Sequence, residues 1–154
     1  MTLSQNPGTL KKFRRTPWRF QQTFRTPLQD LRPFVTTIVS GKEPLQGGSV
    51  TLDQVVFEPK NWLALLARHS LAPEYGREWT LVARDAGEVE ELLEAALCDW
   101  LDFLFVPTPK PFVIYADHDE FTTLYANTKS NLNGVVEALS AKDFKLAPNF
   151  ERVF

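Results

Sequence analysis

Strand-like and helix-like patterns of apolar residues follow one another along residues 34–154, and proline and glycine separate them. Five segments rich in β-branched and aromatic residues are typical of strands, and a sixth is shorter. The five are residues 34–40, 50–57, 79–84, 112–116 and 121–126, and the short one is 144–146. Apolar residues at helical spacing predict helices that begin at Pro59 and that span 86–105 and 131–139.

The resulting order, β-β-α-β-α-β-β-α-(β), combines strand hairpins with helices. Such an order predicts the α+β class, with a single mixed or antiparallel β-sheet packed against about three helices. Of the 154 residues, 44% are hydrophobic, which is enough for one packed core. We therefore expect a single domain over residues 34–154, preceded by a separate segment, residues 1–33. The apolar stripe of the 86–105 helix predicts Leu93 and Trp100 as core residues.

Residues 1–33 differ from the rest of the chain in charge and in pattern. They contain seven Lys and Arg against one Asp, a net charge of +6, whereas residues 34–154 contain ten Lys and Arg against eighteen Asp and Glu, a net charge of −8. Pro17 and Pro27 bias the residues before them toward extended geometry. The sequence therefore predicts an extended, basic and aromatic N-terminal arm attached to an acidic domain.

Two hypotheses account for this arm. Arginines interleaved with aromatic rings suit a polynucleotide, because guanidinium groups meet phosphates while rings stack on bases. The same side chains suit docking on the acidic domain of this chain or of a second copy, as in a homodimer, with the rings buried. We prefer the docked arrangement. In either case the predicted contact residues are Arg14, Arg15, Trp18, Arg19 and Arg25.

The densest group of ionisable side chains is Asp117–Glu120, between two predicted strands. If His118 and Asp119 form a two-residue turn, Ala116 pairs with Phe121. Such a tip favours a solvated turn, although its side chains also suit a divalent cation, acid–base catalysis or contact with a basic partner. The spacing matches neither an EF-hand loop nor a zinc motif.

The sequence contains no nucleophile elbow, phosphate-binding loop or dinucleotide fingerprint. We therefore expect a non-catalytic macromolecule-binding protein without cofactor or metal, in the manner of a small acidic adaptor, inhibitor or immunity-type protein that binds a basic protein partner. The expected partner-binding residues are Glu91, Glu94, Asp102, Asp117, His118, Asp119 and Glu120. Two alternatives stay open: a nucleic-acid-associated protein that uses the arm, and a metal-dependent enzyme with its site at the hairpin tip.

The absence of an apolar stretch of about 20 residues predicts no membrane contact. Cys98 is the single cysteine, so an internal disulfide is excluded and a cytoplasmic location is favoured. Cys98 lies among carboxylates, which disfavour a reactive thiolate.

Overall fold

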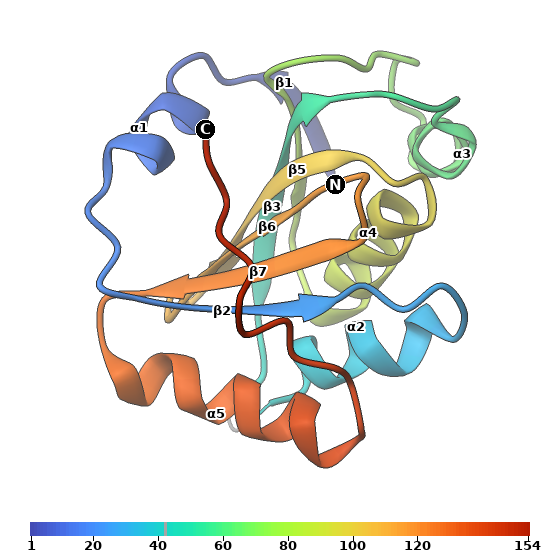
Figure 1. Cartoon of the computed structure of the whole chain (residues 1–154). Coiled ribbons are helices and arrows are strands. Elements are labelled where there is room, and N and C mark those ends of the chain that lie inside the picture. Colours follow the sequence, from blue (N-terminus) through green and yellow to red (C-terminus); the bar gives the residue numbers. More distant parts are fainter. Residues whose placement is uncertain (42) are drawn as a thin grey trace.

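A computed structural model describes residues 1–41 and 43–154, and it confirms the α+β class. Seven strands form one antiparallel sheet in the order β1-β4-β3-β5-β6-β7-β2 (Figure 1). Their bounds are β1 Thr2–Gln5, β2 Phe20–Arg25, β3 Gly47–Gln54, β4 Trp79–Ala83, β5 Asp102–Thr108, β6 Val113–Ala116 and β7 Phe121–Ala126. The five helices are α1 Thr9–Arg15, α2 Leu31–Val39, α3 Lys60–Arg68, α4 Ala86–Cys98 and α5 Lys129–Ala141.

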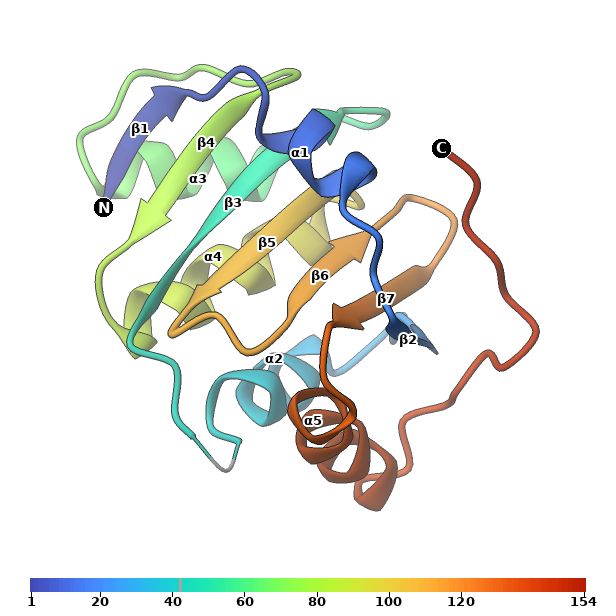
Figure 2. The ribbon, with the colours of Figure 1, turned by 90° about the vertical axis from the view of Figure 1, so that its left-hand side faces the viewer.

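The sheet separates a large core from a smaller one. Helices α2, α3 and α4 lie behind the sheet in Figure 2, and α5 packs against α2, β2 and β7. The main core lies between these helices and the sheet. The opposite side of the sheet, here called the open face, carries α1 and a second buried cluster that includes Phe13, Leu104, Tyr115 and Tyr125. The open face is where polar and aromatic side chains gather.

The structure does not confirm an extended N-terminal arm. Residues 1–33 form β1, α1, β2 and the start of α2, and the two strands are the two edges of the sheet. Phe24 on β2 is fully buried in the main core, and Phe13 on α1 is buried in the second cluster. The segment therefore contributes to the domain's core. Burial of its aromatic rings stabilises the folded segment by more than the conformational entropy that its backbone loses on ordering.

The segment from Phe34 to Val39 belongs to α2, although its β-branched residues predicted a strand. Its buried apolar residues are Phe34, Val35, Ile38 and Val39, which lie on one face of a helix. Packing of this face against α4 outweighs the modest cost of β-branched residues in a helix.

The helix predicted over 86–105 ends at Cys98. Asp85 caps α4, since its Oδ1 accepts a hydrogen bond of 2.8 Å from the amide of Glu88, three residues further on. Leu93 is buried as expected, whereas Trp100 follows the helix and has a left-handed φ of 53°. The residues from Asp102 onward form β5, a strand buried on both faces, so its continuous apolar pattern resembles that of a buried helix.

The hairpin of β6 and β7 is one residue out of the predicted register. Ala116 pairs with Thr122 rather than with Phe121, because residues 118–120 form a three-residue loop that ends with Glu120 at φ 72°. A one-residue shift exchanges the faces of one strand relative to the other. Tyr115 and Thr123 consequently share the open face. The last predicted strand is reduced to a single bridge between Phe24 and Leu146.

Glu88 gives the fold an expected acid dependence. The hydrogen bond from Arg84 lowers the pKa of the Glu88 carboxyl from 4.5 to about 2. A lowered pKa stabilises the folded state above pH 4.5, and this stabilisation is lost as the pH falls toward 2. We expect the loss to be on the order of 1 kcal/mol, since the exposed Arg84 is screened by water.

Urea denaturation at pH 6 and at pH 3 measures this effect. The E88Q variant should be less stable than the unmodified protein at pH 6, and the difference should shrink at pH 3. The variant E90Q on the same helix is the matched control. An E88Q penalty that stays constant between the two pH values would contradict the assignment.

Candidate functional site on the open face

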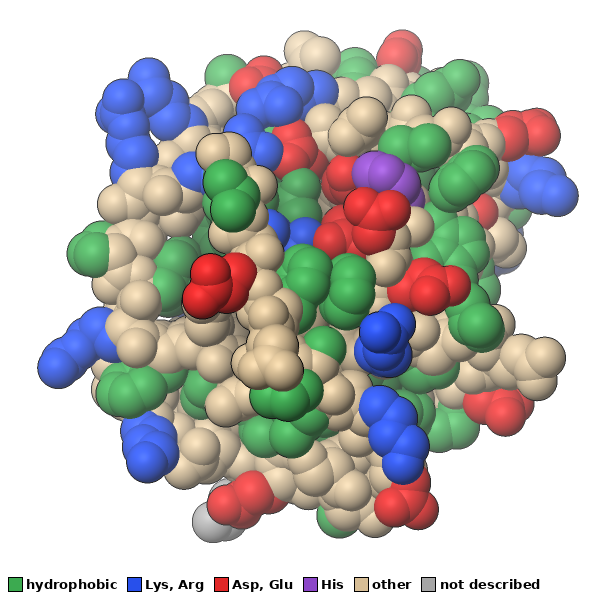
Figure 3. Space-filling model, in the orientation of Figure 1, with side chains coloured by type: hydrophobic (Ala, Val, Ile, Leu, Met, Phe, Trp, Pro, Cys, Tyr) green, Lys and Arg blue, Asp and Glu red, His purple; other side chains and the backbone are tan. Residues whose placement is uncertain are grey.

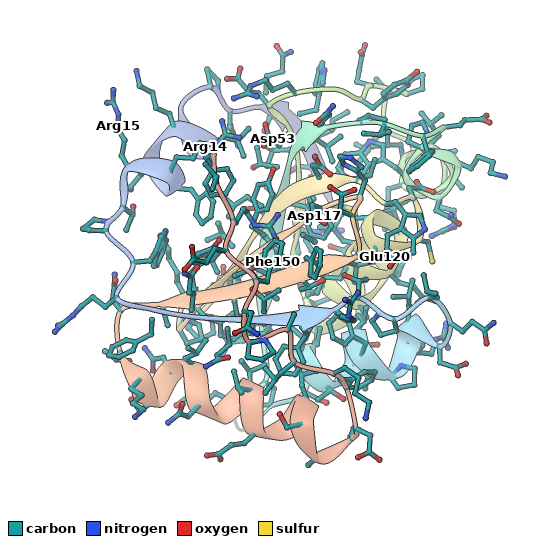
Figure 4. The ribbon with its side chains drawn as sticks, in the orientation of Figure 1. Arg14, Arg15, Asp53, Asp117, Glu120 and Phe150 are labelled. Atoms are coloured by element: carbon teal, nitrogen blue, oxygen red, sulfur yellow. The ribbon has the colours of Figure 1, made fainter. Side chains whose placement is uncertain are left out.

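Asp53 is a buried carboxylate at the centre of an ionic cluster on the open face. It lies at a β-bulge in β3, where Leu52 pairs with Phe103 and Gln54 pairs with Asp102. A bulge changes the direction in which a side chain points. The two carboxylate oxygens of Asp53 accept hydrogen bonds from three groups. These are Arg14 Nη2 at 2.5 Å, Tyr115 Oη at 2.5 Å and Arg77 Nη1 at 2.7 Å. Figure 4 shows Arg14 directed from α1 toward Asp53.

Tyr115 joins this cluster to an aromatic wall. Its ring stacks on Phe13 at a centroid distance of 5.7 Å and contacts the edge of Phe154 at 5.1 Å. Burial, followed by the hydrogen bond to Asp53, raises the pKa of the Tyr115 hydroxyl. The hydroxyl therefore stays protonated and donates to the Asp53 carboxylate.

Residues 145–154, here called the strap, cross the open face. The amide of Ala147 donates to the carbonyl of Thr23, and Phe150 stacks on Phe121 with ring centroids 4.0 Å apart. The side chain of Arg152 is 8% exposed, pairs with Asp117 and donates to Thr123 Oγ1 at 3.0 Å. In Figure 4, Phe150 lies over β7 and Asp117 lies close to the centre of the face. The strap thus anchors the hairpin tip to the sheet.

At the hairpin tip, Asp117 and His118 are bonded to residues of the same chain, whereas the side chain of Asp119 is 73% exposed. Asp102 Oδ1 accepts hydrogen bonds of 2.8 Å from both the amide and Nδ1 of His118. Burial raises the pKa of Asp102, and the hydrogen bond to Asp102 raises the pKa of His118. Asp117 accepts the amides of Asp119 and Phe121 in addition to Arg152. This pairing explains why the cluster forms a stable turn.

The structure brings together four of the seven predicted partner-binding residues. Asp102, Asp117, His118 and Asp119 line one cavity of about 280 Å³ beside the strap. Glu120 forms the end of the loop, and its carbonyl accepts the amide of Thr26. Asp102 was expected within the helix predicted over 86–105. It instead lies in β5 and is buried, because the helix ends before it.

Glu91 and Glu94 lie on α4, on the helix side of the sheet. Glu91 is 3.6 Å from Arg68 and 3.5 Å from His69, and Glu94 is 3.7 Å from Arg32. Burial, with Glu94 and Asp99 nearby, raises the pKa of the Cys98 thiol. Glu91, Glu94 and Cys98 line a separate cavity of about 240 Å³, so they do not form one surface with the hairpin tip.

The predicted arm contacts are divided between the sheet and solvent. Arg14 binds Asp53, and Trp18 donates from Nε1 to the carbonyl of Phe13 at 3.1 Å. Arg25 lies 5.4 Å above the ring of Phe121. Arg15 points away from the sheet in Figure 4, and Arg19 is exposed. Only part of the set is therefore accessible to a partner.

A cavity on the open face was not anticipated from the sequence. It measures about 590 Å³, lies between α1 and the sheet, and is here called the α1 pocket. Its apolar wall includes Phe13, Trp18, Leu104 and Phe112. The side chains come from α1, the segment after it, β5 and the segment before β6, so local patterns could not group them. The alternation of rings with basic residues in 11–18 was the available signal.

Charge distinguishes the α1 pocket from the rest of the molecule. Within the described residues, its lining contains Lys12 and Lys110 and no carboxylate, although the whole chain has a net charge of −2. Figure 3 shows basic side chains gathered on the side of the molecule where α1 lies. Asn127 and Asn131, at the start of α5, add amide groups to the same wall. The pocket is therefore electropositive, with an apolar interior.

No family model matches this sequence, and neither a curated protein nor a solved structure shows significant similarity to it. Among the described residues, no three His, Cys, Asp or Glu side chains are grouped so as to hold a metal ion. In the same part of the chain, no helix has the length and apolar character that crossing a membrane requires. A function for this chain therefore rests on the chemistry of its cavities.

Proposed function

We propose that this protein is a non-catalytic binding protein, and that its ligand is an organic anion with an apolar body held in the α1 pocket. The observation that supports this proposal is the combination of a cavity of about 590 Å³ with two lysines in its lining. Cavities that take small molecules commonly measure about 300–1,000 Å³ and combine apolar walls with a few polar groups.

The two kinds of lining residue have different tasks. The rings of Phe13 and Trp18 shield the apolar body of the ligand from water, and its burial supplies most of the binding free energy. Lys12 and Lys110 select the negative charge, and because both side chains are exposed, each contributes modestly and in a salt-dependent way.

The macromolecular partner expected from the sequence stays a prediction. Of the acidic residues assigned to it, Asp102 and Asp117 are bound by His118 and Arg152 of the same chain. Their charges are therefore less accessible to a basic protein than the sequence suggests. In the α1 pocket, by contrast, no carboxylate among the described lining residues neutralises Lys12 or Lys110.

Fluorescence titration with 8-anilinonaphthalene-1-sulfonate tests the proposal, because this probe combines a sulfonate with two aromatic groups. We expect saturable binding that weakens when salt is raised from 50 to 500 mM. The variants K12Q and K110Q should each weaken binding about two- to fivefold, which corresponds to a screened contact of under about 1 kcal/mol.

Two matched controls assign the binding to this pocket. K11Q changes the neighbouring lysine on α1, which does not line the α1 pocket, and should leave the affinity unchanged. N-phenyl-1-naphthylamine lacks the sulfonate and should bind K12Q and the unmodified protein equally. Probe binding that is indifferent to both Lys12 and Lys110 would overturn the proposal.

A further inference from the structure

We infer that the ligand of the α1 pocket is an aliphatic monocarboxylate, whose chain continues past Phe112 into a second hollow beside α5. This inference rests on the proposed function, since it names the class of anion that the pocket takes. It is drawn from the juxtaposition of two cavities that share part of their lining.

The second hollow, here called the α5 hollow, measures about 310 Å³. It shares Pro111, Phe112 and Asn131 with the α1 pocket, so the two cavities adjoin across these residues. Its lining also includes the apolar residues Ile38 and Val135. Two adjoining cavities suit a long, flexible molecule better than a compact one, and a saturated chain can bend from one into the other.

The charges of the described lining residues favour one direction for the ligand's aliphatic chain. Lys12 and Lys110 line the α1 pocket, whereas the charged side chain described in the lining of the α5 hollow is Glu43. A carboxylate in the hollow would be repelled by Glu43, while in the pocket it meets two ammonium groups. The carboxylate therefore lies in the α1 pocket, and the apolar end of the chain lies toward Ile38 and Val135.

Gly134 supplies an independent observation. It lies within α5, where glycine costs up to about 1 kcal/mol of helix stability relative to alanine. A Cβ added at Gly134 would meet no atom within 4 Å, and the residue has no positive φ that would require glycine. Neither packing nor backbone conformation thus accounts for this glycine. Gly134 lines the α5 hollow, and the missing side chain leaves the hollow open.

Isothermal titration with carboxylates of increasing length tests this inference. We expect dodecanoate to bind at least tenfold more tightly than octanoate, because each buried CH₂ adds up to about fourfold in affinity. The uncharged 1-dodecanol should bind more weakly than dodecanoate and should not respond to K12Q.

The variant G134F directs a ring at the α5 hollow, and its Cβ would meet no atom within 4 Å. It should abolish the tenfold advantage of dodecanoate while leaving octanoate and anilinonaphthalenesulfonate binding within about twofold of the unmodified protein. G134A is the matched control, since a methyl group leaves most of the hollow open, and it should retain the advantage.

The outcomes separate the two proposals. If the anionic probe binds through Lys12 and Lys110 but dodecanoate binds no more tightly than octanoate, the aliphatic ligand is wrong and the anion pocket stands. A chain-length effect that G134F leaves intact would place the chain elsewhere and would also overturn the inference. If no anion binds through the lysines, the proposed function itself fails.

Discussion

Replacing Phe24 with alanine is expected to lower the free energy of unfolding by about 4 kcal/mol. Phe24 has no exposed surface, although it lies in the basic N-terminal segment. Its ring belongs to the main core, and removing a buried phenylalanine typically costs about 3–5 kcal/mol through lost burial and a residual cavity. A loss of this size is a large share of the stability of a domain of this length.

Urea denaturation followed by tryptophan fluorescence measures the effect. L28A is the matched control from the same segment, because Leu28 is 70% exposed and its truncation should change stability by less than about 0.5 kcal/mol. A free arm would make F24A as harmless as L28A. That result would contradict the placement of β2 as an edge strand of the sheet.

Replacing Asp53 with alanine is expected to cost about 3 kcal/mol. The side chain of Asp53 is 7% exposed, and the substitution removes the shared acceptor of Arg14, Arg77 and Tyr115. Breaking a buried ion pair from one side typically costs about 3–5 kcal/mol. The lower end applies here, because the side chains of Arg14 and Arg77 are 29% and 55% exposed and can regain water.

A double-mutant cycle separates the charge from the hydroxyl. In D53A the buried Tyr115 hydroxyl loses its acceptor, so adding Y115F should recover about 1 kcal/mol. R77Q is the control for a solvent-exposed partner and should cost less than about 1 kcal/mol. An additive cycle, with no recovery, would show that the hydrogen bond between Asp53 and Tyr115 does not couple the two residues.

Local signals of the sequence predicted those elements whose residues contact one another nearby in the chain. The helix beginning near Pro59 and strands β4, β6 and β7 were found to within a residue or two, because a proline or a run of β-branched and aromatic residues acts over a few residues. The α+β class followed from the order of these elements. The bias toward arginine and aromatic residues before Phe24 was also visible, and α1 with its lysines belongs to the wall of the proposed pocket.

Where the local sequence was compatible with both a helix and a strand, tertiary packing determined which of the two forms. Residues 34–39 are β-branched but form α2, because packing against α4 buries their apolar side. Asp102 to Thr108 form a central strand buried on both faces, and a continuous apolar pattern cannot be distinguished from a helix by its period. Residues 1–33 became both edges of the sheet, since strands β4 and β7 offered unpaired backbone groups that only long-range pairing could satisfy.

The candidate site was beyond the reach of local pattern for the same reason. The sequence located the charges of the hairpin tip, but burial of Asp102 and the pairing of Asp117 with Arg152 depend on residues 16 and 35 positions away. The α1 pocket unites Lys12 with Lys110, nearly a hundred residues apart in the chain, because α1 folds across the open face of the sheet. The sequence by itself determined which side chains were available. Long-range packing determined which of them share a cavity, because residues far apart along the chain can be neighbours in the folded structure.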